Sequence, residues 1–184
     1  MALAHAILAL LADRSFSGYE LTKEFEGSVG CFWKATHQQI YRELAALEER
    51  AFVHADLVTQ EGRPNKKLYE LTEAGKRWLS EWLAEPSEPC VIREDMLVKM
   101  FAGYLTSPEV LIAEIERRKA LHAEKLEYYR QVEREHFGDL STIPIEKRFG
   151  YLSLKRGLRY EADWVAWCDE AAALLHSPTF APPG

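Results

Sequence analysis

One segment near the C-terminal end of the chain, residues 145–176, constrains the fold more than any other, because its apolar side chains recur at alternating steps of three and four. This spacing aligns them along one face of a helix, as in the a and d positions of a coiled coil. A second apolar row runs beside the first, so a single neighbouring helix would leave apolar surface uncovered. The first row is Tyr151, Leu154, Leu158, Glu161, Val165, Cys168, Ala172 and Leu175, and the second is Tyr160, Trp164, Trp167, Ala171 and Leu174.

Residues 108–136 predict a second long helix, again with two apolar rows. Two arrangements account for these faces: the helices pack on each other within one chain, or they also pack against a second copy of the chain. We favour the second arrangement, a homodimer, because the apolar faces together exceed what an isolated helical hairpin hides. In that arrangement the first row of residues 145–176, from Tyr151 to Leu175, is the dimerisation seam.

Glu161 is the one charged residue of this seam. We expect it to be hydrogen-bonded to Arg156, Arg159 or a tyrosine across the interface, where it would help to fix the register. The alternative is a helix rotation that brings Glu161 to the rim of the interface. Glu161 and His122 can also meet in a helical core, where a polar side chain is usually a satisfied core group.

The chain changes character at EPSEPC, residues 85–90, whose two prolines indicate a linker. We expect one domain before it, residues 1–85, and a helical domain after it, residues 93–184. The helical domain should open with a helix around residues 93–105, which ends at Thr-Ser-Pro, and continue with the two long helices.

Residues 1–85 contain short elements in close succession. An apolar helix is followed by two capping-box patterns, Ser17 to Glu20 and Thr36 to Gln39, so helices are expected to begin there. Two β-compatible runs then flank a turn rich in Gly, Pro and Asn, and a fourth helix closes the domain. This is the order of a winged helix-turn-helix domain, whose third helix enters the DNA major groove. The expected fold class is mainly α with a small β-hairpin: a winged helix-turn-helix domain followed by an all-α dimerisation domain.

Net charge alone argues against a nucleic-acid partner, because 29 acidic residues outnumber 23 basic ones. Any signal for DNA binding must therefore be local. Residues 27–42 contain no Asp or Glu, and residues 61–67 place the densest cationic cluster on the tip of the hairpin. The candidate DNA-binding residues are Lys34, Thr36, His37, Gln38, Gln39, Tyr41, Arg42, Arg63, Lys66 and Lys67.

These candidates are expected to have two roles. Gln38, more than the capping Gln39, should face base edges, since Gln pairs bidentately with adenine. Lys66 and Lys67 should meet phosphates, which position a protein without reading sequence. Each signal has an ordinary alternative: a charged hairpin tip is commonly a solvated turn, and the acid-free window fits a buried segment around residues 31–33.

Three blocks, IYRELAALEER, GRPNKKLYELTEAG and LKRGLRYEADWVAW, resemble the PadR-type transcriptional regulators, and the likeness covers nearly the whole chain. The resemblance implies a homodimeric winged-helix regulator, most often a repressor on a palindromic operator that a small molecule releases. The alternative is a regulator without a small-molecule effector, acting through a protein partner or as an activator. One position departs from the family: Ala51 stands where Gly usually follows the third helix, and Ala must either strain or end the helix differently.

The resemblance leaves an effector site open. Aromatic side chains near the expected dimer axis form a candidate pocket for a planar hydrophobic or aromatic ligand. The residues are Phe101, Tyr104, Tyr160, Trp164 and Trp167. The alternative, that these aromatic side chains fill the dimer core, stays open.

Catalytic patterns are missing from the sequence. The six histidines lack H-E-x-x-H spacing, and neither a Gly-rich phosphate loop nor G-x-S-x-G occurs. We therefore expect neither an enzyme nor a bound metal or cofactor. The three cysteines include no C-x-x-C pair, and no apolar run reaches the roughly 20 residues that cross a bilayer. These features predict a cytoplasmic protein without a membrane partner.

Overall fold

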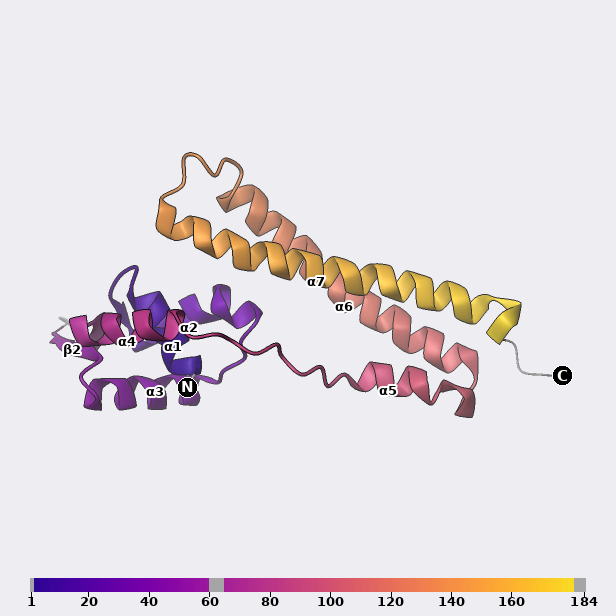
Figure 1. Cartoon of the computed structure of the whole chain (residues 1–184), viewed down its shortest axis with the longest axis horizontal. Coiled ribbons are helices and arrows are strands. Elements are labelled where there is room, and N and C mark those ends of the chain that lie inside the picture. Colours follow the sequence, from indigo (N-terminus) through magenta and orange to yellow (C-terminus); the bar gives the residue numbers. More distant parts are fainter. Residues whose placement is uncertain (1, 60–64, 181–184) are drawn as a thin grey trace. The chain divides into compact units, whose positions relative to one another are not determined.

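The structure is a computed structural model that describes residues 2–59 and 65–180. The chain divides into two compact units, Met1–Pro89 and Cys90–Gly184 (Figure 1). This division falls at the Pro-containing segment that the sequence marks as a linker. The expected class, mainly α with a small antiparallel sheet, is confirmed.

The N-terminal unit has the predicted order of four helices and two hairpin strands, with two short additions, β1 and η1. The elements are α1 (Ala2–Leu11), β1 (Phe16–Ser17), α2 (Gly18–Gly27), the short 3-10 helix η1 (Val29–Cys31), α3 (His37–Glu49), β2 (Val53–Val58), β3 (Lys66–Leu71) and α4 (Glu73–Leu83). Both predicted capping boxes are present. The hydroxyl oxygens of Ser17 and Thr36 accept the backbone N–H of Glu20 and Gln39, whose side chains accept the N–H of Ser17 and Thr36 in return.

The sheet has one strand more than the sequence predicted. β2 and β3 form the expected antiparallel hairpin, and β1 pairs with the other edge of β3, which makes the order β1-β3-β2. β1 is only two residues long, so it carries no periodic signal that a sequence could show. It nevertheless ties the start of α2 to the hairpin, because Ser17 is both a strand residue and the N-cap of α2.

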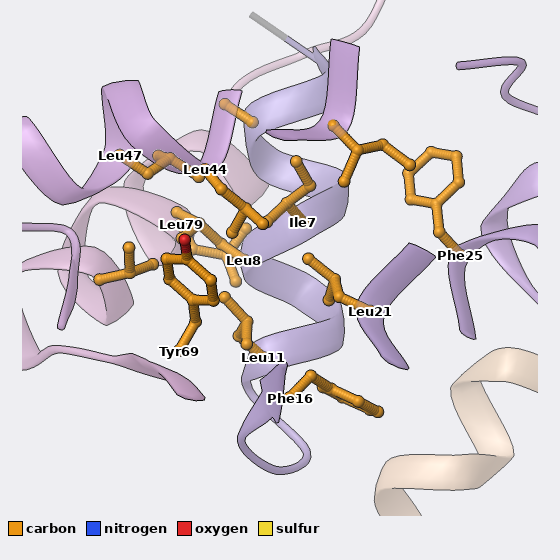
Figure 2. Close-up of a cluster of buried hydrophobic side chains, with 13 residues drawn as sticks. Ile7, Leu8, Leu11, Phe16, Leu21, Phe25, Leu44, Leu47, Tyr69 and Leu79 are labelled. Atoms are coloured by element: carbon orange, nitrogen blue, oxygen red, sulfur yellow. The ribbon is translucent and has the colours of Figure 1, made fainter. Parts of the chain in front are cut away.

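The core of this unit is built around α1 (Figure 2). Ile7 and Leu8 are fully buried there, with side chains from α2, α3, the sheet and α4 around them. α3 contributes Ile40, Leu44 and Leu47, each 0% exposed. Burying a Leu or Ile side chain stabilises a fold by about 1.5–3 kcal/mol. One face of α3 is therefore packed into the core, and its other face is left to solvent.

The end of α3 settles the question raised by Ala51. Its φ is 57°, the left-handed region that glycine adopts at little cost. The N–H of Ala51 donates to the carbonyl of Glu48, and the N–H of Phe52 donates to that of Leu47, which is the Schellman arrangement. The helix therefore ends as it would with glycine, and Ala51 carries the strain.

The C-terminal unit is helical. Its elements are α5 (Asp95–Phe101), the 3-10 helix η2 (Gly103–Leu105), α6 (Pro108–His136), α7 (Ile145–His176) and the 3-10 helix η3 (Pro178–Phe180). The predicted bounds of the two long helices are confirmed, and these helices pack along each other (Figure 1). The helix expected over residues 93–105 is shorter. It stops before Gly103, where a Cβ would lie 2.7 Å from Cδ1 of Leu111.

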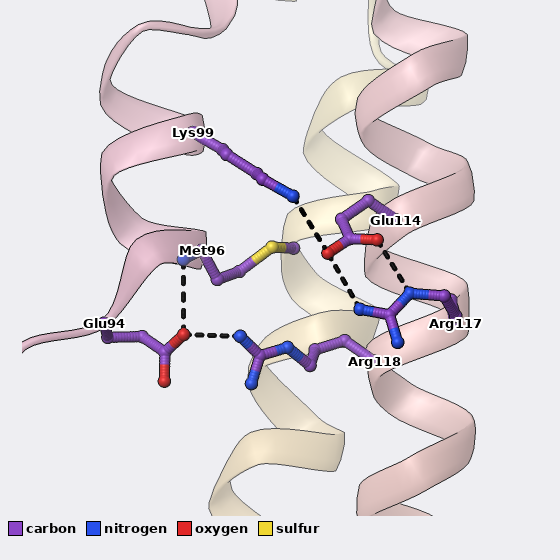
Figure 3. A network of polar contacts seen from close by, with 6 residues as sticks. All are labelled: Glu94, Met96, Lys99, Glu114, Arg117 and Arg118. Carbon is purple, nitrogen blue, oxygen red and sulfur yellow. Dashed lines mark hydrogen bonds and ion pairs between the residues drawn. The ribbon is translucent and has the colours of Figure 1, made fainter.

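α5 is fastened to α6 by two ionic contacts (Figure 3). Glu94, which caps α5 by accepting the N–H of Met96, also accepts a bond from Arg118 at 2.5 Å. Glu114 on α6 accepts bonds from Arg117 and from Lys99 of α5, and these two cations lower the pKa of Glu114 to about 2. Charge pairing therefore supplements the apolar contact between α5 and α6.

The seam predicted on α7 is used within the chain at three positions. Leu158, Glu161 and Cys168 are at most 9% exposed in a single chain. Cys168 packs with Met96 of α5 and Ile115 of α6. This corrects the expectation that these residues face a second copy, since intrachain packing already covers them. The rest of the seam (Tyr151, Leu154, Val165, Ala172 and Leu175) is only half-buried.

Candidate nucleic-acid interface

The first turns of α3 present a polar face. Its apolar side chains enter the core, while the candidate residues Lys34, Thr36, His37, Gln38, Gln39, Tyr41 and Arg42 are all exposed. The alternative that the acid-free window is a buried segment is wrong, because Phe32 and Trp33 are 66% and 40% exposed. An exposed helix face on a rigid core is the arrangement that a recognition helix needs.

Two glutamines on this face, Gln38 and Gln39, differ in their hydrogen bonding. The side-chain oxygen of Gln39 accepts the backbone N–H of Thr36 at 2.8 Å, so it is engaged in the cap. Gln38, beside it, is exposed and has no hydrogen-bond partner among the described residues. The Gln38 amide is therefore available to an external partner, and its role in reading a base stays a prediction. Arg42, one turn further on, is exposed and lacks a carboxylate partner within the described ranges.

Three of the candidate DNA-binding side chains, two lysines and a histidine, already have carboxylate partners. His37 Nε2 lies 3.0 Å from Glu26, and Lys67 Nζ lies 3.1 Å from both carboxylate oxygens of Glu48 on α3. Glu48 raises the pKa of Lys67 through this hydrogen bond.

The third contact pairs Lys66 with Glu20 at 3.5 Å. All three pairs are solvent-exposed and therefore weak, on the order of 0–1 kcal/mol, so a phosphate can replace the carboxylate. Spacing along the chain did not indicate these partners, because they lie outside the acid-free window and only the fold brings them to Lys66, Lys67 and His37. The remaining hairpin candidate, Arg63, lies outside the described residues.

The candidate effector residues are only partly brought together. The rings of Trp164 and Trp167 meet edge to face with their centroids 5.4 Å apart, and His122 stacks on Trp164 at 4.9 Å. Tyr160 approaches the same histidine at 6.2 Å. Phe101 is 88% exposed, and Tyr104 is similarly open, so neither is enclosed in a cleft with the tryptophans.

Two hollows in the C-terminal unit lie elsewhere. The larger, of about 580 Å³, is lined by Lys99, Leu105, Val110 and Arg117 among others. The smaller, of about 210 Å³, lies between α6 and α7 and is lined by side chains such as Leu126. Neither is lined by an aromatic side chain, so the aromatic effector cleft stays a prediction.

The described residues contain neither a metal-binding cluster nor a membrane-spanning helix. Within residues 2–59 and 65–180 no group of three or more His, Cys, Asp or Glu is placed to hold a metal ion. No described helix is long and apolar enough to span a bilayer.

Comparison with known proteins assigns the family. Residues 7–81 match the model of the PadR-like family of transcriptional regulators, and residues 92–176 match the model named virulence activator alpha C-term. The chain is 37% identical to a probable transcriptional regulator of Mycobacterium tuberculosis, over 95% of this chain and 98% of that protein. A second relative, PadR of Bacillus subtilis, decides the family at 31% identity: the chain belongs to the PadR-like family. Members of this family are DNA-binding regulators and not enzymes.

Other relatives cover the full length of the fold. The negative transcriptional regulator PadR of Bacillus subtilis is 31% identical over 94% of this chain and 97% of that protein. Its crystal structure in complex with operator DNA superposes with a TM-score of 0.85 at 27% identity, covering 95% of this chain and 99% of that one. The virulence activator AphA of Vibrio cholerae superposes with a TM-score of 0.80 at 31% identity, covering 97% and 99%. These likenesses confirm the winged-helix architecture of a PadR-like regulator.

Proposed function

We propose that this PadR-like regulator is a sequence-specific DNA-binding repressor that acts as a homodimer on a palindromic operator. The observation that carries the proposal is the exposed polar face of α3, held by Ile40, Leu44 and Leu47 in the core. The same fold at a TM-score of 0.85 is that of Bacillus subtilis PadR in complex with operator DNA. Gln38 is assigned to base edges, and Lys34 and Arg42 to phosphates.

Exposed apolar side chains support the homodimer. In the C-terminal unit, large hydrophobic residues remain more than half exposed on α5, α6 and α7. They include Val98, Phe101, Val110, Leu121, Phe149, Leu152 and Leu174. Exposed apolar surface of this extent in a water-soluble domain marks an interface. A second copy covers it in a two-fold arrangement, which presents two copies of α3 to two half-sites about one helical turn, or a multiple of it, apart.

The direction of regulation rests on the relatives. One is called a negative regulator and another a virulence activator, each at 31% identity. We assign repression by likeness to the negative regulator, whose complex with operator DNA superposes with a TM-score of 0.85. Activation, or action through a protein partner, is the alternative.

A small planar effector completes the proposal. Bacillus subtilis PadR has been solved in complex with p-coumaric acid, a planar aromatic acid, and that structure superposes with a TM-score of 0.80 at 27% identity, covering 96% of this chain and 100% of that one. We assign an aromatic effector of this class to the C-terminal unit, where Tyr160 and Trp164 gather around His122. A ligand shifts DNA binding only by its difference in affinity between the two states.

The test of DNA binding uses the purified full-length protein. Genomic fragments that the protein captures should share a palindrome, and fluorescence anisotropy should show tighter binding to that site than to a scrambled duplex. Gln38→Ala should cost about 1–3 kcal/mol at one base pair per half-site and relax the preference there. Arg42→Ala should weaken both duplexes alike and reduce the salt slope by about one unit for each phosphate that it no longer neutralises. Captured fragments without a shared sequence would overturn the proposal.

Repression and the effector need separate tests. Transcription from the captured promoter should fall when the protein is added to purified RNA polymerase, whereas a rise would establish the activator alternative. p-Coumaric acid or a related planar acid should quench tryptophan fluorescence and weaken operator binding over the same concentration range. Quenching with unchanged DNA affinity would reject the regulatory role of the effector.

A further inference from the structure

Gly18 and Tyr41 touch across the helix-turn-helix. Gly18 is the first residue of α2, and Tyr41 lies in the second turn of α3. A Cβ placed on Gly18 would lie 2.6 Å from Cε1, 2.9 Å from Cζ and 3.0 Å from the hydroxyl oxygen of the Tyr41 ring. Distances this short leave no room for any side chain at position 18 unless the ring moves. The absence of a side chain at Gly18 thus makes the position of the Tyr41 ring possible.

The contact leaves the Tyr41 side chain partly exposed. Gly18 is buried, whereas Tyr41 is 46% exposed. Among the residues that the structure describes, the Tyr41 hydroxyl has no hydrogen-bond partner. Such a hydroxyl is suited to donate a hydrogen bond to an external acceptor.

The location of the Tyr41 ring indicates which group accepts this hydrogen bond. In a helix-turn-helix, the recognition helix enters the major groove and the helix before it crosses the sugar-phosphate backbone. The Tyr41 hydroxyl lies beside the first turn of α2, the helix that crosses the backbone in such a complex, and this position favours a phosphate as its acceptor. Tyrosine hydroxyls are among the groups that contact DNA phosphates.

We propose that the Tyr41 hydroxyl donates a hydrogen bond to a backbone phosphate of the operator, and that Gly18 is the positioning residue that leaves room for the ring to make this contact. The proposal rests on the DNA-binding function proposed above. It assigns Gly18 a role in affinity that is separate from the stability of the fold.

Replacing Gly18 by alanine should change protein stability and DNA affinity in different directions. The backbone of Gly18 is outside the positive-φ region, so Gly18→Ala brings no backbone strain, and alanine is the better helix former. The atoms that it meets belong to the far end of an exposed side chain, which can swing into solvent. We therefore expect Gly18→Ala to keep or raise the melting temperature while it weakens DNA binding. A purely structural glycine would lower both together.

The experiment compares four variants with the wild type by anisotropy on the captured operator and on a scrambled duplex, at several salt concentrations, and by thermal unfolding. Tyr41→Phe should weaken both duplexes about threefold to tenfold per half-site, the value of one neutral hydrogen bond, without changing the salt slope. Gly18→Ala should show a similar decrease in affinity. The double variant, Gly18→Ala with Tyr41→Phe, should be no weaker than the single variants, because both remove the same contact.

Gly27→Ala is the matched control, because Gly27 ends the same helix and nothing lies within 4 Å of a Cβ there. It should leave DNA affinity unchanged. The proposal is overturned if Tyr41→Phe binds as the wild type does, or if the effects add in the double variant. It is equally overturned if Gly18→Ala binds normally or loses affinity and melting temperature together. Should the wild type bind no DNA at all, the proposed function fails first.

Discussion

Glu161 on α7 accepts a hydrogen bond from His122 on α6, with 2.5 Å between its carboxylate oxygen and Nδ1 of the imidazole. Its second oxygen lies 2.9 Å from Nζ of Lys125. The Glu161 side chain is 1% exposed, so both of its oxygens are satisfied inside the helical pair. The sequence had placed Arg156, Arg159 or a tyrosine opposite this carboxylate, and those partners were wrong, whereas the meeting with His122 is confirmed.

This contact predicts a large cost for removing the carboxylate. Glu161→Ala leaves the two donors without their acceptor and opens a gap between α6 and α7. We expect the free energy of unfolding to fall by about 2–4 kcal/mol in urea titrations at fixed protein concentration. Glu170→Ala, at an exposed position of the same helix, should change it by less than about 0.5 kcal/mol. Equal decreases in both variants would show that the pairing contributes nothing.

Substitutions at two leucines on α7 should distinguish an effect on folding from an effect on dimerisation. Leu158 is 9% exposed and Leu152 is 64% exposed. Leu158→Asp places a charge in the packed face and should cost about 3 kcal/mol or more, with loss of helical circular dichroism on mild heating. Leu152→Asp should keep the helical signal and lower the molar mass measured by light scattering, because it marks the face assigned to the second copy. A wild type that is monomeric at micromolar concentration would contradict the homodimer.

The strained residue at the end of α3 predicts a stabilising substitution. Ala51 has a φ of 57°, so Ala51→Gly removes the cost of the left-handed conformation. We expect a gain of about 0.5–1 kcal/mol in thermal or chemical unfolding. Ala45→Gly is the control, because Ala45 is exposed in the middle of the same helix, and the substitution there should destabilise the fold by about 1 kcal/mol. Destabilisation at both positions would mean that the left-handed turn is not a strained one.

Glu114 predicts how stability changes in acid. Arg117 and Lys99 lower its pKa from 4.5 to about 2 in the folded state. A lowered folded pKa stabilises the fold above the unfolded value, and this contribution is lost as the pH falls from about 4.5 to about 2. The wild type should therefore be more stable than Glu114→Gln at pH 7, and the difference should shrink at about pH 3 and disappear only below about pH 2. A difference that is constant over this range would exclude the titration of Glu114 as its cause.

The ion pair between Lys67 on β3 and Glu48 on α3 predicts a salt effect on DNA binding. If Lys67 reaches a phosphate in the complex, Lys67→Ala should reduce the salt slope by about one unit for each phosphate released, or about two in a symmetric dimer. Glu48→Gln should raise affinity for all sequences, because it removes the carboxylate that holds the lysine in the free protein. Lys76→Ala is the control, since Lys76 is paired with Glu73 on α4 and should leave the slope alone. An unchanged slope for Lys67→Ala would make the hairpin a solvated turn.

Local chemistry explains how much of this fold the sequence could predict. The starts of α2 and α3 were readable because Ser17 and Thr36 are capping residues whose partners lie three positions away. The bounds of α6 and α7 were readable because proline stands at the start of each, and the strands because Gly, Pro and Asn separate them. The exposed face of α3 followed from the helical spacing of Ile40, Leu44 and Leu47.

Contacts between residues that are distant in the chain were decided by the tertiary structure alone. The periodicity of α7 showed that two faces are apolar, but only the packing of α5 and α6 showed that Leu158 and Cys168 turn inward within one chain. Likewise, no spacing rule brings Glu48 to Lys67 or places Tyr41 on Gly18. Capping and periodicity are set by neighbours within a turn or two, whereas these contacts depend on how whole elements dock, and docking is decided by the shape of the complete core.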